Sequence, residues 1–162
     1  MDKFFMKIEK GFTLIELIIT IFVISVGLVG VMTLIQNTLQ SASAVRSNLT
    51  ASYLAQEGIE LVRNIRDANW VEGEEWDKGL THCFGGCQMD YNDSSLFIYD
   101  GSFLISDNEG FYRYGFGKES KFQRKITINL NIEYLEVKSE VFWEDREKNQ
   151  SIEVVEHLYN WI

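Results

Sequence analysis

Glu16 is a carboxylate at the start of a long apolar segment, where its charge has chemical consequences. The nineteen residues that follow it, Leu17 to Ile35, carry no charged side chain and are mostly Ile, Val and Leu. An ionised carboxylate within a membrane-spanning helix costs roughly 2.5–3.5 kcal/mol on insertion scales, so such a residue usually has a partner and a task. The sequence therefore places its clearest candidate for functional chemistry at Glu16.

The residues around this carboxylate form a motif, because Lys10 is followed by Gly11-Phe12-Thr13-Leu14-Ile15-Glu16-Leu17. This motif resembles the processing site of type IV prepilins and of the pseudopilins of type II secretion. The resemblance implies that a peptidase cuts after Gly11, that Phe12 becomes the N-methylated N-terminus, and that Glu16 is the assembly carboxylate. The motif covers few residues, but Gly, Phe and Glu at this spacing before a long apolar run are specific.

The resemblance also implies a role and a set of partners. It implies a non-enzymatic structural subunit, most like a minor pilin, that needs no cofactor. The partners would be other pilin subunits, contacted through the N-terminal helix, the prepilin peptidase/methyltransferase, the inner membrane and the pilus assembly platform. The chain would lie in the bacterial inner membrane before assembly, and in the pilus, at the cell surface or in the periplasm afterwards. Two alternatives stay open: a pseudopilin of a type II secretion system, and a membrane-anchored surface-binding or DNA-uptake module that never polymerises.

The N-terminal region reads as a leader, residues 1–11, and a membrane-length helix, residues 12–35. The helix would measure about 36 Å at a rise of ~1.5 Å per residue, enough to cross a bilayer. The leader lysines place the N-terminus in the cytoplasm by the positive-inside tendency. A secretory signal is disfavoured because the apolar run is too long and no Ala-x-Ala-like site closely follows it, whereas a plain signal anchor stays open.

Gly27 and Gly30 lie one turn apart in this segment and allow two interpretations. Small residues permit close contact between helices in a membrane. Alternatively, they form a weak point where the helix loosens within a filament, in the place of the proline that often marks such a stretch in the family. The chain contains no proline, which suits one unbroken helix.

The remaining chain predicts an α+β fold: a long N-terminal helix, half transmembrane and half amphipathic, packed on a C-terminal antiparallel sheet. Residues 36–66 would continue the helix, 67–95 would be an irregular connector, and 96–162 would form the sheet. The expected apolar stripe of the helix recurs every three or four residues, at Leu39, Ala42, Val45, Leu49, Ser52, Ala55, Ile59 and Val62.

The sheet region shows a period of two residues. A tight hairpin is expected around Asp100-Gly101, joining residues 96–99 to 102–105, because Asp-Gly suits a type I′ turn. After a turn and a short strand near residue 112, three longer strands are expected at 122–130, 133–144 and 151–161, with a loop at 145–150. One apolar and one polar face on these strands is typical of an antiparallel sheet that is covered on one side.

Cys83 and Cys87 are the only cysteines and lie beyond the membrane segment. An oxidising exterior makes them a candidate disulfide, which would stabilise the connector by only ~2 kcal/mol because the loop is small. The alternative is a metal site with His82 and Asp90, but a Cys-x₃-Cys pair without a second pair is a weak metal signal.

Composition and motifs argue against several function classes. The net charge is −9, and removal of the leader, with three lysines against Asp2 and Glu9, would leave about −10. Such an acidic chain is not expected to bind nucleic acid strongly and generally, although a local basic patch stays compatible with it. No nucleophile elbow, phosphate loop or zinc-protease motif occurs, and His157 in the last expected strand reads as an ordinary sheet histidine.

The motif generates a direct prediction about processing. Gly11→Ala should impair cleavage, because the resemblance puts Gly11 immediately before the cut. Co-expression with a prepilin peptidase should then leave a precursor that does not shift on a gel. Mass spectrometry of the unmodified chain should find methyl-Phe12 at its N-terminus, whereas an intact Met1 would indicate a simple anchor.

Overall fold

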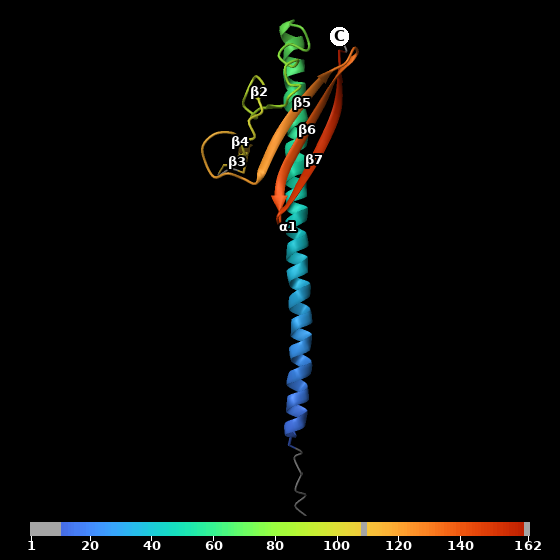
Figure 1. Cartoon of the computed structure of the whole chain (residues 1–162), viewed down its shortest axis with the longest axis vertical. Helices are drawn as coiled ribbons and strands as arrows, with labels where there is room; N and C mark the ends of the chain where they lie inside the picture. The colour runs from blue at the N-terminus through green and yellow to red at the C-terminus, as the bar shows by residue number, and fades with distance from the viewer. Residues whose placement is uncertain (1–10, 108–109, 161–162) are drawn as a thin grey trace, which may run out of the picture. The chain divides into compact units, whose positions relative to one another are not determined.

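The structure, a computed structural model, describes residues 11–107 and 110–160. In these residues the elements are α1 (Leu14–Glu72), β1 (Cys87–Gln88), β2 (Phe97–Ile98), β3 (Ile105–Ser106), β4 (Tyr112–Arg113), β5 (Phe122–Leu130), β6 (Tyr134–Asp145) and β7 (Lys148–Tyr159), as shown in Figure 1. The chain divides into two compact units, Met1–Ser43 and Ala44–Ile162, and part of α1 belongs to each.

In the first unit, the part of α1 that the structure describes is apolar and long enough to cross a membrane by length and composition. Its hydroxyl side chains bond back to carbonyls one turn earlier: Thr20 to Glu16, Ser25 to Ile21, and Thr33 to Val29. These bonds matter because an unpaired polar group in hydrocarbon costs several kcal/mol. The few polar residues of this segment are therefore compatible with a lipid environment.

The second unit contains an antiparallel sheet in the order β2-β1-β5-β6-β7, and a separate ribbon of β3 and β4. Figure 1 shows the three long strands β5, β6 and β7 alongside the outer part of α1. Along β5 and β6 buried side chains alternate with more exposed ones. The predicted α+β class, a long helix packed on an antiparallel sheet, is confirmed.

The core of this unit consists of two apolar clusters. One gathers Ile59 and Val62 of α1 with residues of the connector and sheet such as Ile126 and Val137. The other gathers Ala51, Leu54 and Ala55 of α1 with Leu104, Phe122, Val141 and Trp143. Between the two clusters, one small or polar residue lies on each of three elements: Gly58 on α1, Arg124 on β5 and Ser139 on β6.

The C-terminal end of α1 is closed by a Schellman motif. Gly73 adopts φ +75° and donates to the carbonyl of Trp70 at 3.2 Å, and Glu74 donates to the carbonyl of Asn69 at 2.9 Å. Glycine suits this position because it enters the left-handed region without a Cβ penalty. The helix therefore ends at Glu72, six residues beyond the predicted end at Arg66, because the stop signal is Gly73.

The predicted stripe on the outer helix is correct only in part. Ala55, Ile59 and Val62 are buried, but Leu39, Val45 and Leu49 are exposed. The buried face instead begins at Ser47 and continues through Ala51, Leu54, Gly58, Leu61, Arg66 and Asn69. The prediction was incomplete because it followed one row of residues along the helix. The close approach of helix and sheet also buries small and polar residues that lie outside this row.

The hairpin predicted around Asp100-Gly101 is wrong. β2 pairs with β1 beside the cysteines, and β3 pairs with β4 instead of with residues 96–99. The Asp100 carboxylate accepts the Ser102 N–H at 2.9 Å, and Leu104 exchanges backbone hydrogen bonds with Phe122 and Ser120. The Asp-Gly pair thus turns the chain between two separate pairings, because each flanking segment finds a better partner elsewhere.

The predicted loop at residues 145–150 is also wrong. β6 and β7 remain paired up to Asp145 and Lys148, so the turn contains only Arg146 and Glu147. Both adopt positive φ, 53° and 61°, as a two-residue type I′ hairpin turn requires. The polar composition misled the prediction, because strand ends that extend into solvent are also polar.

Gly58 provides a test of the close helix–sheet approach. A Cβ at this position would lie 2.3 Å from Ser139 Oγ and 3.2 Å from Arg124 Cδ. Gly58→Ala should therefore lower the free energy of unfolding by about 1–2 kcal/mol, because overpacking outweighs the ~1 kcal/mol gain in helix propensity. Urea unfolding of the full chain in detergent, followed by tryptophan fluorescence, measures the change.

Two further variants make this test specific. Adding Ser139→Ala should recover much of the loss, because the closest atom is removed. Gly30→Ala is the matched control, since open space surrounds that glycine and the sheet unit should keep its stability. A Gly58→Ala variant as stable as the unmodified chain would contradict the packing described.

Candidate functional site

The first turn of α1 contains the residues of the sequence motif. Thr13 precedes the helix and its Oγ1 accepts the N–H of Glu16 at 3.3 Å, while its carbonyl accepts the N–H of Leu17. This is the N-cap arrangement, in which a threonine oxygen satisfies an otherwise unpaired backbone donor. Glu16 consequently lies in the first helical turn, where the helix dipole favours negative charge.

The side chains around Glu16 form an uncovered apolar surface. Phe12 is 84% exposed, and the apolar residues of the helix from Leu14 to Ile35 are all exposed. Soluble monomers rarely expose an apolar patch larger than a few hundred Å², and a larger patch usually marks a surface that contacts a membrane or another protein. This segment is therefore built to be covered by lipid or by other helices, and Glu16 is its one acidic group.

In the second unit, Arg124 is the central polar residue and is fully buried. Its guanidinium donates to the carbonyl of Leu54 on α1 at 3.2 Å and to the carbonyl of Met89 in the connector at 2.7 Å. Glu57 on α1 supplies the counter-charge, with a carboxylate oxygen 3.3 Å from Nη1. Arg124 thereby joins helix, sheet and connector, and its Nε finds no hydrogen-bond partner among the described residues.

Tyr114 and Asp90 extend this polar region. The Tyr114 hydroxyl donates to the carbonyl of Arg124 at 3.1 Å, and the Asp90 carboxylate accepts the Tyr114 N–H at 3.1 Å. Burial raises the pKa of the Tyr114 phenol to about 12, because the charged phenolate loses its hydration. The ribbon segment that follows β4 is therefore held to the core by a neutral tyrosine.

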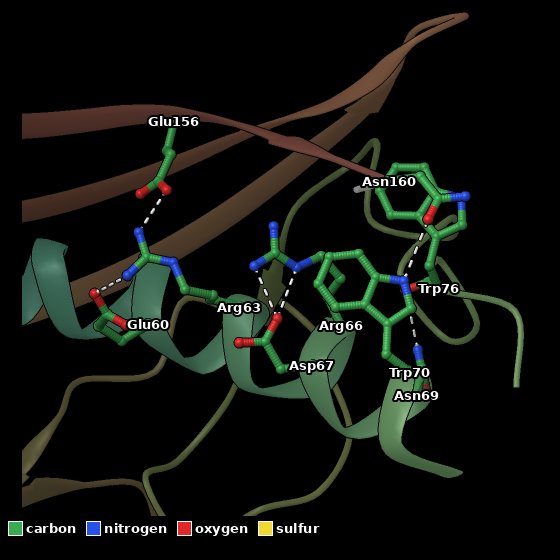
Figure 2. A network of polar contacts seen from close by, with 9 residues as sticks. All are labelled: Glu60, Arg63, Arg66, Asp67, Asn69, Trp70, Trp76, Glu156 and Asn160. Carbon is green, nitrogen blue, oxygen red and sulfur yellow. Dashed lines mark hydrogen bonds and ion pairs between the residues drawn. The ribbon is translucent and has the colours of Figure 1, made fainter. Parts of the chain in front are cut away.

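A second polar network connects the end of α1 with β7, as Figure 2 shows. Arg63 bonds to Glu60 on its own helix and to Glu156 on β7, and the bond to Glu156 raises the pKa of the Arg63 guanidinium. Arg66 pairs with Asp67 at 2.8 Å and places its guanidinium 4.5 Å from the ring centre of Trp70. The Arg63–Glu156 pair joins the helix to the last strand of the sheet, while the other contacts order the side chains along the helix end.

The structure joins Cys83 and Cys87 in a disulfide, with 5.3 Å between their Cα atoms. His82 lies beside this pair, but both sulfur atoms are used in the disulfide and offer no thiolate to a metal. Both half-cystines are buried in the larger cluster, so the bridge also fills the core next to Ile126. His157 packs against Tyr134 on the neighbouring strand, with 4.3 Å between the ring centres.

Arg124 and Gly58 were missed by the sequence analysis. The signal for Arg124 was present, since it shares the inward phase of β5 with Phe122 and Ile126. A charged residue in that phase predicts a buried ion pair or a misplaced strand, and the helix offered Glu57 as its partner. No local pattern, however, placed Gly58 opposite Ser139.

The fold and the N-terminal segment together define a class: a membrane-length helix with an acidic first turn, and an outer continuation that packs on an antiparallel sheet. Residues 6–32 match the family model of the prokaryotic N-terminal methylation motif. The chain thus carries a prepilin-type methylation motif, and the match supports the type IV pilin and pseudopilin family. No curated protein sequence and no solved structure matches the chain significantly.

This match has consequences for partners and location. A prepilin-type motif implies processing by a prepilin peptidase and assembly with other pilins. Together with the apolar helix it indicates anchoring in a membrane.

Tyr114 gives the sheet unit a specific pH dependence. Its folded-state pKa of about 12 lies above the ordinary value near 10, so the neutral phenol stabilises the fold below pH 10. That contribution should be lost as the pH rises from about 10 to 12. Tyr114→Phe should remove this part of the slope, measured as the difference in unfolding free energy between the two chains at each pH. Identical slopes for both chains would show that Tyr114 ionises freely in the folded state.

Proposed function

We propose that the chain is a minor pilin-like structural subunit of a type IV pilus. It is inserted in the inner membrane, cut after Gly11, N-methylated at Phe12 and assembled through its apolar helix. The observation that carries the proposal is the position of Glu16, in the capped first turn of a membrane-length helix and within the residues that match the methylation motif.

The chemistry of assembly is an ion pair between subunits. A cut after Gly11 creates a free amine at Phe12, while Glu16 of an adjoining subunit offers a carboxylate in the same apolar layer. Each charge alone is costly away from water, and pairing offsets part of that cost. Because only one axial position of a subunit brings the two groups together, the pair sets the register of the assembly.

The apolar helix performs two tasks in succession. It first holds the subunit in the membrane, and it then packs among the helices of other subunits. Its exposed aliphatic surface serves both environments, because lipid tails and neighbouring helices are equally apolar. A Cβ added at Gly27 or Gly30 would have no atom within 4 Å, so both glycines leave room for a neighbouring helix to approach closely.

A pseudopilin of a type II secretion system is the second candidate, since the methylation motif is compatible with both systems. The two differ in where the assembled subunit is found. Sheared surface filaments that contain the chain support the pilus, whereas retention in the periplasm with loss of a secreted protein in the deletion strain supports secretion.

The role of Glu16 is tested by Glu16→Ala. The variant should insert in the membrane and be cleaved normally, because the helix and the cleavage site are kept. It should be lost from sheared filaments, since the amine of the neighbouring Phe12 has no partner. Immunoblots of membrane and filament fractions measure both quantities.

The control for this test is Glu133→Ala, which removes an exposed carboxylate from the turn between β5 and β6. This control should enter filaments like the unmodified chain. Normal incorporation of Glu16→Ala would refute the assembly role. A cleavage defect would show that Glu16 is needed for processing by the peptidase instead.

A further inference from the structure

A hollow of about 510 Å³ lies at the C-terminal end of α1, within the sheet unit. Two indoles, Trp70 and Trp76, line it together with the carboxylate residues Glu74, Glu75 and Asp77 and the amide of Asn160. Figure 2 shows both tryptophans and Asn160 at this end of the helix. Its size falls within the range of small-ligand sites, about 300–1,000 Å³.

The walls of the hollow are held in place by hydrogen bonds. The Schellman motif fixes Gly73 and Glu74 to the last turn of α1. The Asn69 amide, itself buried, donates to the carbonyls of Trp76 at 3.2 Å and Lys78 at 3.0 Å, and so folds the segment after the helix back onto it. A preformed wall lowers the entropy that a ligand must spend on ordering its site.

The charge around the hollow is negative. Lys78 pairs with Glu74 at 2.9 Å, but Glu75 and Asp77 form no ion pair within the described residues. The last turn of α1 contains no basic residue, so that turn supplies no side-chain cation to offset the negative end of the helix dipole. A positive ligand is therefore favoured over a neutral or negative one.

The indoles add a second, independent preference for a cation. Trp is the best of the aromatic side chains at attracting a cation to its face. Trp70 already attracts Arg66, whose guanidinium carbon lies 4.5 Å from the ring centre, so a ligand would have to use the remaining face of Trp70 or the indole of Trp76. The Trp70 Nε1–H is used in a bond to Asn160 Oδ1 at 3.3 Å, which fixes the indole plane at the wall.

We propose that this hollow binds a small alkylammonium cation, such as a trimethylammonium group, against its tryptophans and unpaired carboxylates. The methyl groups would contact the indoles, while Glu75 and Asp77 would face the positive charge. An alkylammonium ion holds its hydration water weakly, so little free energy would be lost in removing that water. This binding is separate from assembly through Glu16 and would give the outer unit a ligand of its own.

The test compares choline with its neutral isostere, 3,3-dimethylbutan-1-ol, on the full chain in a polyoxyethylene detergent, whose headgroup is neither an ammonium nor a sugar. Ligand-observed NMR titrations give both dissociation constants. Choline should bind at least about threefold more tightly than the alcohol, as expected for a cation–aromatic contact supported by carboxylates. Equal affinities, or no binding of choline, would overturn the proposal.

Variants locate the site. The pair Glu75→Gln with Asp77→Asn should remove the preference for choline, and Trp70→Leu should weaken choline binding at least about threefold. The matched control, Glu119→Gln with Glu133→Gln, removes the same charge from exposed positions elsewhere and should change nothing. An equal loss in the control would mean general charge attraction and would overturn the site.

Two further ligands identify the source of the cation. If glycerophosphocholine binds as tightly as choline, the natural ligand is a lipid headgroup. If glycerophosphocholine binds more weakly than choline, the ligand is a free ammonium compound, and either result supports the proposal. If methyl glucoside binds more tightly than choline, the hollow is a sugar site and the proposal is overturned. Since Glu16→Ala leaves this site intact, failure here and failure of the assembly role are distinguishable.

Discussion

The fold of the outer unit depends on one buried guanidinium. Arg124 lies between two apolar clusters and binds the carbonyl of Leu54 on the helix, the carbonyl of Met89 in the connector and the carboxylate of Glu57. Leaving a buried charged group without one of its hydrogen-bond partners costs at least ~1–3 kcal/mol, so few other residues would be tolerated in this polar layer. Because Arg124 needs those acceptors at fixed positions, it determines how the helix is placed along the sheet.

The rest of the unit accommodates this layer. Gly58 lets the helix approach Ser139 closely, and Tyr114 ties the ribbon segment to the backbone of Arg124. The disulfide between Cys83 and Cys87 anchors the connector in the larger cluster near β5. The carbonyl of Met89, two residues after Cys87, then accepts a hydrogen bond from Arg124. At the far end, Arg63 and Trp70 connect the helix to β7 and its following residue, Asn160.

The membrane-length part of α1 obeys a different constraint. Its apolar side chains are exposed, and the hydroxyls of Thr20 and Ser25 are bonded to its own backbone. A helix of this kind is stable alone in lipid and remains available for other helices. Its capped first turn holds Glu16 shortly after Phe12, so the two residues whose charges would pair in the proposed assembly lie in one short segment.

The sequence by itself determined the elements whose signals are local. The methylation motif, the apolar run, the long strands β5 and β6 and the α+β class could all be read from spacing and periodicity, because each depends on neighbours in the chain. The tertiary structure decided the pairings. The segment before Asp100 joined β1, residues 105–106 joined β4, and a helix face with Ser47, Gly58 and Arg66 was buried. These outcomes depend on competition between distant partners and on the space between helix and sheet. The hollow beside Trp70 likewise exists only because a Schellman turn brings residues 74–77 back to the helix end, and because β7 ends beside it.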